Sequence, residues 1–252
     1  MTLTISCFLI VCPMVFLAGF VDSIAGGGGL ISLPAYLLAG VPMHNAIATN
    51  KLSSATGTAI STVRLCKNKF VDWGLALPCI SMALLGSFVG AHLALTASDK
   101  LLKWMLIPIL PIVAFYVLKK KNMEEDIQTD ISRRKQWLLC AACSLAVGCY
   151  DGFYGPGTGT FLLLCLTRFA GLDVLTASGV TKFINLVTNL TALVTFLFYG
   201  KVYLLLGFVA GICSILGNLI GSGMLTKNAD KVLKPAILGV ICIFFVRTVT
   251  SL

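Results

Sequence analysis

The sequence predicts an all-α polytopic membrane protein, and three observations carry that prediction. Hydrophobic residues make up 58% of the 252 positions and charged residues only 12%, whereas about a quarter of the residues of a soluble domain are charged. Apolar runs of about 18 residues or more, long enough to cross a bilayer as helices, recur along the chain. The alternating pattern of a membrane β-barrel is absent. We therefore expect about eight to ten membrane segments packed as helices.

In the first half, glycine and proline separate the apolar segments. Four glycines at residues 26–29 interrupt the first helix, and Gly40 and Pro42 end the segment after them. That segment has only about ten residues, so we expect a half-helix or a re-entrant segment. Gly86 and Gly90 form a G-x-x-x-G pattern that permits close helix packing. The expected elements in order are Thr4–Val21, Leu30–Ala39, the polar segment Ala46–Leu65, Gly74–Thr96 and Leu101–Leu118.

The second half repeats this order after a polar and basic linker, residues 122–135. Its expected elements are Trp137–Tyr150, Phe161–Phe169, Thr176–Tyr199, Val202–Leu225 and Val232–Thr250. The short segment again follows a glycine-rich break, GPGTG, at residues 155–159. We therefore divide the chain into a first transmembrane repeat, residues 1–121, and a second, residues 136–252.

Matched residues support the duplication. The motif GFVDSIAGGGGLISLP begins at Gly19, and GCYDGFYGPGTGT begins at Gly148. At a shift of 129, Gly19, Asp22, Gly26 and Gly28 fall on Gly148, Asp151, Gly155 and Gly157. Beyond the motif the shift becomes 131, and Lys51, Gly86 and Gly90 then fall on Lys182, Gly217 and Gly221. The D-K-x-L-K pattern at residues 99–103 recurs at residues 230–234.

The cations predict the orientation. The net charge of +9 does not indicate nucleic-acid binding, because the largest basic cluster lies around the linker, where cytoplasmic loops carry Lys and Arg. With the linker inside and five crossings in each half, the repeats are inverted and both termini lie outside. If the short segments re-enter, each half has four spans and the repeats are parallel. The positive-inside rule favours the inverted arrangement, which recurs among transporters.

Lys51 and Lys182 are the least expected residues in this composition. A cation at the centre of a membrane helix costs at least about 2.5–3.5 kcal/mol. Each lysine could snorkel to the headgroups, but both precede hydrogen-bonding residues on the same helical face. The face holds Ser54 and Thr58 after Lys51, and Asn185 and Asn189 after Lys182. A cation with neutral polar neighbours suits an anion.

The glycine-rich breaks favour the same class of ligand. Glycine permits close approach of the backbone, and a short helix that starts after it presents free N–H groups and a positive dipole end. The alternative is a tight turn with close packing. Asp22 and Asp151 leave three alternatives open: pairing with Lys182 and Lys51, capping of the short helices, or proton transfer for coupling. Cys140 and Cys143 have no second pair and no nearby histidine, so we expect no metal site and no cofactor.

These motifs resemble the sulfite exporter TauE/SafE family, also called the toluene sulfonate uptake permease family. The resemblance rests on GFVDSIAGGGGLISLPAYLLAG, ATNKLSSATGT, DGFYGPGTGT and ASGVTKFINLVTNLTA, and it covers both halves. The second motif has Pro-Gly-Thr-Gly where the family commonly has more glycines. The resemblance implies a permease of the cell (inner) membrane for small anions, often sulfur-containing ones such as sulfite or organosulfonates. The family includes importers and exporters, so the direction of transport does not carry over.

We therefore predict a secondary transporter for small anions, not an enzyme, that works by alternating access between the two repeats. No nucleotide-binding motif is present, so a proton or ion gradient is the expected driver, and a homo-oligomer is possible. The expected anion-binding residues are Lys51, Lys182, Thr49, Asn50, Ser54, Asn185, Asn189, Gly26, Gly27, Gly28, Gly155 and Gly157. An alternative function is an intramembrane aspartyl protease, in which Asp22 and Asp151 would share a proton.

Overall fold

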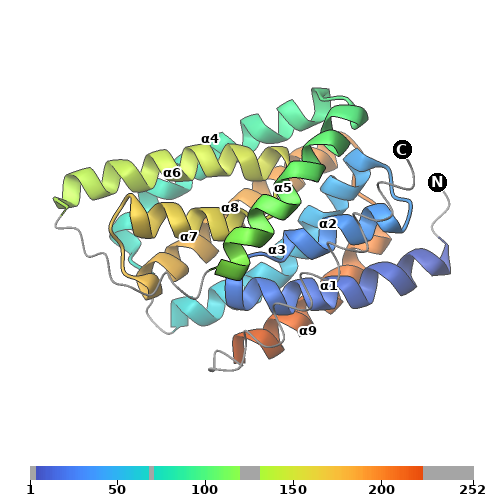
Figure 1. The fold of residues 1–252 in the computed structure, drawn as a ribbon, viewed down its shortest axis with the longest axis horizontal. Helices are drawn as coiled ribbons and strands as arrows, with labels where there is room; N and C mark the ends of the chain where they lie inside the picture. Colours follow the sequence, from blue (N-terminus) through green and yellow to red (C-terminus); the bar gives the residue numbers. More distant parts are fainter. Residues whose placement is uncertain (1–3, 68–70, 120–130, 224–252) are drawn as a thin grey trace.

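The computed structural model describes residues 4–67, 71–119 and 131–223, and these ranges fold into nine helices with no strand (Figure 1). The helices of the first half are α1 (Ile5–Ala25), α2 (Gly29–Leu38), α3 (Met43–Lys67), α4 (Trp73–Thr96) and α5 (Asp99–Lys119). Those of the second half are α6 (Arg133–Phe153), α7 (Thr158–Arg168), α8 (Val174–Phe198) and α9 (Leu204–Gly223). The predicted all-helical class is confirmed.

Helix length and composition mark out the membrane spans. Among the described residues, four helices are long and apolar enough to cross a bilayer, and they are α1, α4, α8 and α9. Helices α2 and α7 have 10 and 11 residues. At 1.5 Å per residue each is about 15 Å long, half the thickness of the hydrocarbon core. The glycine breaks are therefore followed by half-length helices, as the sequence predicts.

Most expected boundaries shift by one to three residues, and two shift by four. Helix α1 continues past Val21 to Ala25, because the chain leaves helical geometry only at Gly26, where φ is +74°. Asp22 therefore lies on a regular helix turn. Helix α6 begins at Arg133, so the last residues of the expected 122–135 linker form its first turn. Residues 120–130 and the expected final span, residues 232–250, lie outside the described residues.

The helices pack in two bundles that exchange elements between the halves of the sequence. Helix α1 lies along α9, and α4 lies along α6, at opposite edges of the molecule in Figure 1. We call α1, α2, α3 and α9 the α1 bundle, and α4, α6, α7 and α8 the α4 bundle. Helix α3 packs against α8 where the bundles meet, and α5 crosses between them to contact α2, α3 and α7. Each bundle thus contains helices from both halves.

Glycines bring the exchanged helices into backbone contact. A Cβ added to Gly86 or Gly90 of α4 would overlap backbone atoms of Leu145 or Cys149 in α6. In the same way, Gly217 and Gly221 of α9 press on the backbone of α1, at Phe16 and Phe20. The expected packing role of the G-x-x-x-G pattern is confirmed, because such small residues let helix backbones approach in a membrane.

Aspartates that cap two helices mark bundle ends outside the membrane spans. The carboxylate of Asp72 accepts from the amides of Gly74 and Leu75 at the start of α4, and Arg133 of α6 binds it at 2.7 Å. Partial burial alone would raise the pKa of Asp72, but the bonds and charge of Arg133 and the two amides outweigh it and lower the pKa. Asp173 caps α8 through the amides of Leu175 and Thr176.

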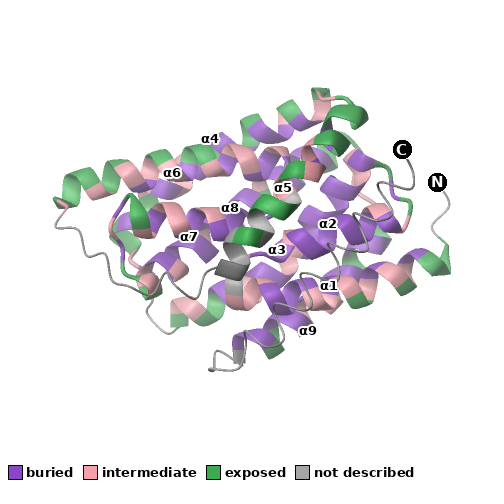
Figure 2. Ribbon diagram, in the orientation of Figure 1, coloured by how far each residue is buried: buried purple, intermediate pink, exposed green. Residues whose placement is uncertain are grey.

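The outer surface is apolar and the interior partly polar, which is the reverse of a soluble protein. Exposed side chains on α4 and α9 include Leu85, Phe88 and Phe208, all more than half exposed. Figure 2 shows buried residues, in purple, along the faces where helices meet. Polar side chains such as Asn50 and Lys51 are among the buried residues. Lipid therefore covers the apolar faces, while polar groups gather where α3 meets α8.

We predict that Gly90→Ala lowers the thermal unfolding temperature of the purified protein in detergent, because the added methyl meets the carbonyl of Cys149. Overpacking of this kind costs about 1–3 kcal/mol. Val89→Ala, at a half-exposed position on the lipid side of the same helix, is the control and should leave the temperature nearly unchanged. Equal melting temperatures for Gly90→Ala and the parent would contradict backbone contact between α4 and α6.

Candidate functional site

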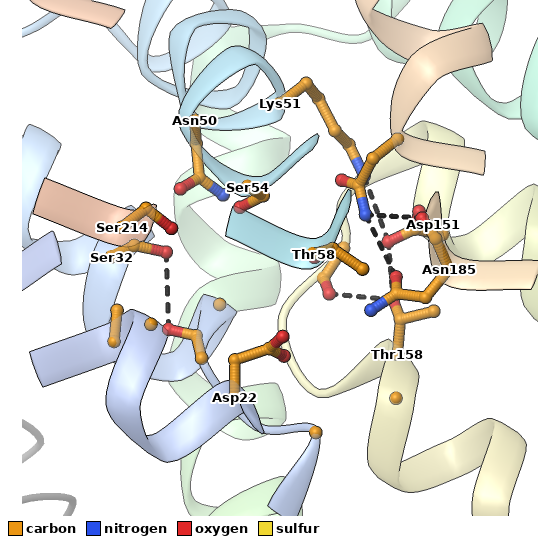
Figure 3. A pocket seen from close by; sticks show the side chains of 18 of the residues that line it. Asp22, Ser32, Asn50, Lys51, Ser54, Thr58, Asp151, Thr158, Asn185 and Ser214 are labelled. Atoms are coloured by element: carbon orange, nitrogen blue, oxygen red, sulfur yellow. Dashed lines mark hydrogen bonds and ion pairs between the residues drawn. The ribbon is translucent and has the colours of Figure 1, made fainter. Parts of the chain in front are cut away.

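A polar cavity of about 30 Å³ lies between the two bundles, with room for about two water molecules. Figure 3 shows Lys51, Asp151, Thr158 and Asn185 on one side of it and Asn50, Ser54, Ser32 and Ser214 on the other. The polar side chains that line the cavity are Asp22, Ser32, Asn50, Lys51, Ser54, Thr58, Asp151, Thr158, Asn185, Asn189, Ser214 and Asn218. Glycines of both breaks supply the remaining polar wall.

The two glycine breaks meet back to back at this cavity. A Cβ on Gly26 would lie 2.9 Å from the backbone of Gly159, and a Cβ on Gly159 would lie 2.6 Å from the carbonyl oxygen of Gly26. Gly26, Gly155 and Gly157 also have positive φ angles, which residues other than glycine adopt at a cost. The breaks therefore combine tight packing with exposure of backbone to the cavity, and their non-helical backbone is buried in protein as the membrane requires.

The first ion pair is fully buried. Lys51 of α3 lies 2.9 Å from Oδ1 of Asp151 on α6, and each side chain is 2% exposed. The hydroxyl of Thr158, at the start of α7, lies 2.7 Å from the same Oδ1. Oδ2 of Asp151 has no hydrogen-bond partner in the described structure. One carboxylate oxygen thus holds both contacts, and the other is left free.

The second ion pair is slightly more exposed than the first, and its lysine makes two contacts with its aspartate. Nζ of Lys182 on α8 lies 2.6 Å from Oδ2 of Asp22 on α1, with side-chain exposures of 7% and 14%. The same ammonium group also donates to the backbone carbonyl of Asp22. Each lysine therefore pairs with the acid of the other half of the sequence. Of the three alternatives for Asp22 and Asp151, the structure contains the pairing with Lys182 and Lys51.

The expected polar stripes face the cavity. Ser54 and Thr58 of α3 line it, as do Asn185 and Asn189 of α8. Nδ2 of Asn189 donates to both the backbone carbonyl and Oδ1 of Asn185, at 2.7 and 3.0 Å. Asn50 also lines the cavity, and its Oδ1 is buried without a hydrogen-bond partner. These groups surround Lys51 with neutral hydrogen-bonding side chains.

Three expected binding residues do not line the cavity. Lys182 does not line the cavity itself. Its ammonium group binds Asp22, which does line the cavity. Thr49 is fully buried elsewhere on α3, where its hydroxyl accepts from the amide of Tyr203 at 3.0 Å and positions the start of α9. Gly27 is buried beside the lining glycines Gly26 and Gly28.

Four polar side chains that line the cavity are not predicted from the sequence: Ser32, Thr158, Ser214 and Asn218. Ser214 and Asn218 lie one helical turn apart on α9, and the amide of Asn218 donates to the carbonyl of Ser214 at 3.0 Å. A buried polar pair at this spacing in an apolar helix is a usable sequence indicator. Thr158 belongs to the second glycine-rich motif, where attention to the glycines alone misses it.

The charges of the site cancel, since two lysines face two aspartates. Each aspartate is bound to a lysine, so no carboxylate dyad that shares a proton is formed, and the protease alternative lacks its catalytic group. Among the described residues, no cluster of His, Cys, Asp or Glu could hold a metal ion. The site therefore holds buried cationic and hydrogen-bonding groups in a cavity between two bundles.

Comparison with known proteins gives the family. The family model described as "Sulfite exporter TauE/SafE" matches residues 11–248. The chain belongs to the TauE/SafE family. Its resemblance to that family in the glycine-rich motifs is thereby confirmed, and the protein is a membrane transporter and not an enzyme.

Individual relatives agree with this assignment. A "Probable membrane transporter protein ORF9" of Sinorhizobium sp is 37% identical over 220 residues, which cover 87% of this chain and 84% of the relative. The "Probable membrane transporter protein YfcA" of Escherichia coli K12 is 36% identical over 223 residues, 88% of this chain and 81% of the relative. A "Probable membrane transporter protein" of Haemophilus influenzae is 32% identical, with 88% and 86% covered. No solved structure matches the chain.

We predict that Lys51→Met destabilises the protein strongly, because it leaves the carboxylate of Asp151 buried without its ion-pair partner. Removal of one partner from a buried pair costs about 3–5 kcal/mol. The double variant Lys51→Met/Asp151→Asn removes both charges and should recover most of the loss. Thermal unfolding of the two variants in detergent measures the difference. If the double variant is no more stable than Lys51→Met, the buried pair is not the cause.

Proposed function

We propose that the protein is a secondary transporter for small anions, and that sulfur-containing anions such as sulfite or organosulfonates are its substrates. The observation that carries the proposal is Lys51, a buried cation on the wall of a polar cavity between two bundles of a transporter-family chain. An ionisable residue at membrane depth marks a substrate or ion path by default. The description of the matching family names sulfite.

The chemistry of the cavity suits an oxyanion. Sulfite and sulfonates present three oxygen acceptors on one centre. The donors available to them are the ammonium group of Lys51, the amide of Asn185, the hydroxyls of Ser54 and Thr58, and amides of the glycine breaks. Charge-assisted hydrogen bonds from such groups are about twice as strong as neutral ones. In this proposal Lys182 acts through Asp22, which it holds in place.

Alternating access would then move one bundle against the other. The proposal takes the rigid units to be the α1 bundle and the α4 bundle, because the tight glycine contacts join α1 to α9 and α4 to α6. The cavity and both ion pairs lie between these units. The cavity is small, and a movement that widens it on either side would expose Lys51. The moving units would thus differ from the halves of the sequence.

We further propose that residues 1–121 and 136–252 are repeats of inverted topology. The support for the repeat is a set of matched contacts at the sequence shifts of 129 and 131, and the inversion rests on the positive-inside rule. Gly86 meets Leu145 and Gly217 meets Phe16, and these two contacts map onto each other. The crossed ion pairs map onto each other in the same way. A domain exchange of this kind follows naturally from duplication of one unit.

The inverted arrangement places residue 252 outside the cell, by the positive-inside rule. We predict that a tag attached at this residue reacts with an impermeant reagent added to intact cells. A tag inserted within residues 122–132 of the expected linker is the matched control and should react only after the membrane is opened. A C-terminal tag that reacts only from the cytoplasmic side refutes the inverted model.

We predict that the double variant Lys51→Met/Asp151→Asn folds but loses uptake of radiolabelled sulfite in reconstituted vesicles, because the cavity then lacks its cation. Sulfite should also raise the unfolding temperature of the parent protein and not that of the double variant, since a ligand stabilises the state that binds it. Methanesulfonate and acetate, tested in the same way, separate sulfur oxyanions from carboxylates.

The matched control for uptake is Thr191→Val. This residue lies on α8 like Asn185, but its hydroxyl donates to Val187 and it lines a lipid-facing groove on the other side of the helix. The control should retain both uptake and thermal stabilisation. Equal uptake by the parent and a folded Lys51→Met/Asp151→Asn variant would show that Lys51 is not needed for anion transport.

A further inference from the structure

We propose that Asp151 takes up the proton that accompanies the anion, so that one proton and one monovalent anion enter the site together. This inference rests on the proposed anion transport and assigns its coupling to a single carboxylate. Its starting observation is that the site is neutral before any anion binds, with Lys51 and Lys182 matched by Asp151 and Asp22.

Charge balance requires a partner for the anion. A monovalent anion in this site would leave one negative charge uncompensated, and buried unpaired charge is costly. Protonation of one aspartate restores neutrality. It also releases a lysine, whose ammonium group can then bind the anion in place of the carboxylate. Proton and anion binding would therefore favour each other.

The contacts of the lysines indicate which carboxylate takes the proton. Lys51 has one partner in the described structure, Oδ1 of Asp151, so loss of that charge frees its three donors. Lys182 is held by the backbone carbonyl of Asp22 as well as by its carboxylate. Neutralisation of Asp22 would leave Lys182 tethered. Lys51 lines the cavity and Lys182 does not. Only Lys51 can therefore exchange its aspartate for an anion that is bound in the cavity.

The surroundings of Asp151 also suit a neutral acid. Its Oδ2 is buried without a partner, so a proton can add there without breaking an existing hydrogen bond. The hydroxyl of Thr158 lies 2.7 Å from both Oδ1 of Asp151 and the carbonyl oxygen of Gly155, and its single proton can be donated to Oδ1 after Lys51 leaves. The protonated Oδ2 can donate to the anion. Asp22 has no such hydroxyl partner among its hydrogen bonds, and glycine stands at the matching place in the first motif.

Other titratable groups lie near Asp151 on several helices. Lys51 faces it from α3, and the second pair, Asp22 of α1 with Lys182 of α8, lies at the same cavity. On α6 itself, the hydroxyl of Tyr150 donates to the carbonyl of Pro156 at 2.6 Å. The part of α4 that packs on α6 here presents Ser87 and Gly90, which do not titrate. Of these groups, Lys51 is the charged one that contacts Asp151 directly, so a change of charge on Asp151 acts first on Lys51.

The test uses methanesulfonate, whose own charge does not change near neutral pH, in vesicles that contain a pH-sensitive dye. The parent protein should accumulate methanesulfonate when the outside is acidic, with proton entry reported by the dye. Asp151→Asn should abolish accumulation and proton entry, while exchange of labelled for unlabelled methanesulfonate continues. Thr191→Val, which lies outside the site, is the control and should keep proton entry coupled to the anion, whereas Asp22→Asn tests the competing carboxylate. Loss of proton coupling in Asp22→Asn but not in Asp151→Asn overturns the proposal.

Infrared difference spectroscopy of the purified protein gives a readout independent of transport. Acidification should produce the high-frequency carbonyl band of a buried protonated carboxyl group, distinct from the band of the exposed carboxyl groups and strengthened by methanesulfonate or sulfite, in the parent and in Asp22→Asn. The band should be missing in Asp151→Asn. If neither anion binds or moves, the proposed function fails on its own, and the acid-induced band still decides whether Asp151 takes up a proton. Its absence from the parent, or its persistence in Asp151→Asn, overturns the assignment.

Discussion

Two buried ion pairs between the α1 bundle and the α4 bundle are the interaction on which the rest of the structure depends. Lys51 and Lys182 could not remain charged inside a membrane protein without Asp151 and Asp22. Because each aspartate comes from the other half of the sequence, the pairs form only when the halves interlock. The exchange of α9 toward α1 and of α4 toward α6 provides that interlock. The ion pairs at the centre therefore depend on the same exchange of helices that packs α1 on α9 and α4 on α6.

Glycine makes the ion pairs geometrically possible. The breaks touch at Gly26 and Gly159, where any side chain would push the bundles apart. The short helices α2 and α7 start from these breaks, and each is about half as long as the hydrocarbon core is thick. The polar backbone of the breaks lies between the two bundles, which shield it from lipid. The same glycines that permit packing thus create the cavity, and the two explanations for them in the sequence are compatible.

Local chemistry was more predictable than long-range packing. The glycine breaks, the half-length helices and the stripes after Lys51 and Lys182 follow from residue types and the helical period. Which helix covers which does not, because an apolar helix fits any apolar neighbour about equally well. The sequence also makes Lys51 and Lys182 look equivalent, although only Lys51 lines the cavity. That difference comes from the position of Asp22, whose carbonyl and carboxylate both hold Lys182. Thr49 shares α3 with Lys51 but points to the start of α9.

In the proposed duplication, the matched positions of the two halves differ where they face the cavity. Ser54 and Thr58 stand opposite the larger amides Asn185 and Asn189, and Thr158 has glycine at its counterpart. A perfectly symmetric interior would give both lysines the same partners and the same freedom. Divergence instead leaves one lysine tethered to backbone and the other held by a single carboxylate. The proposed transport uses this difference, because the Lys182 pair would hold the bundles together while the Lys51 pair opens.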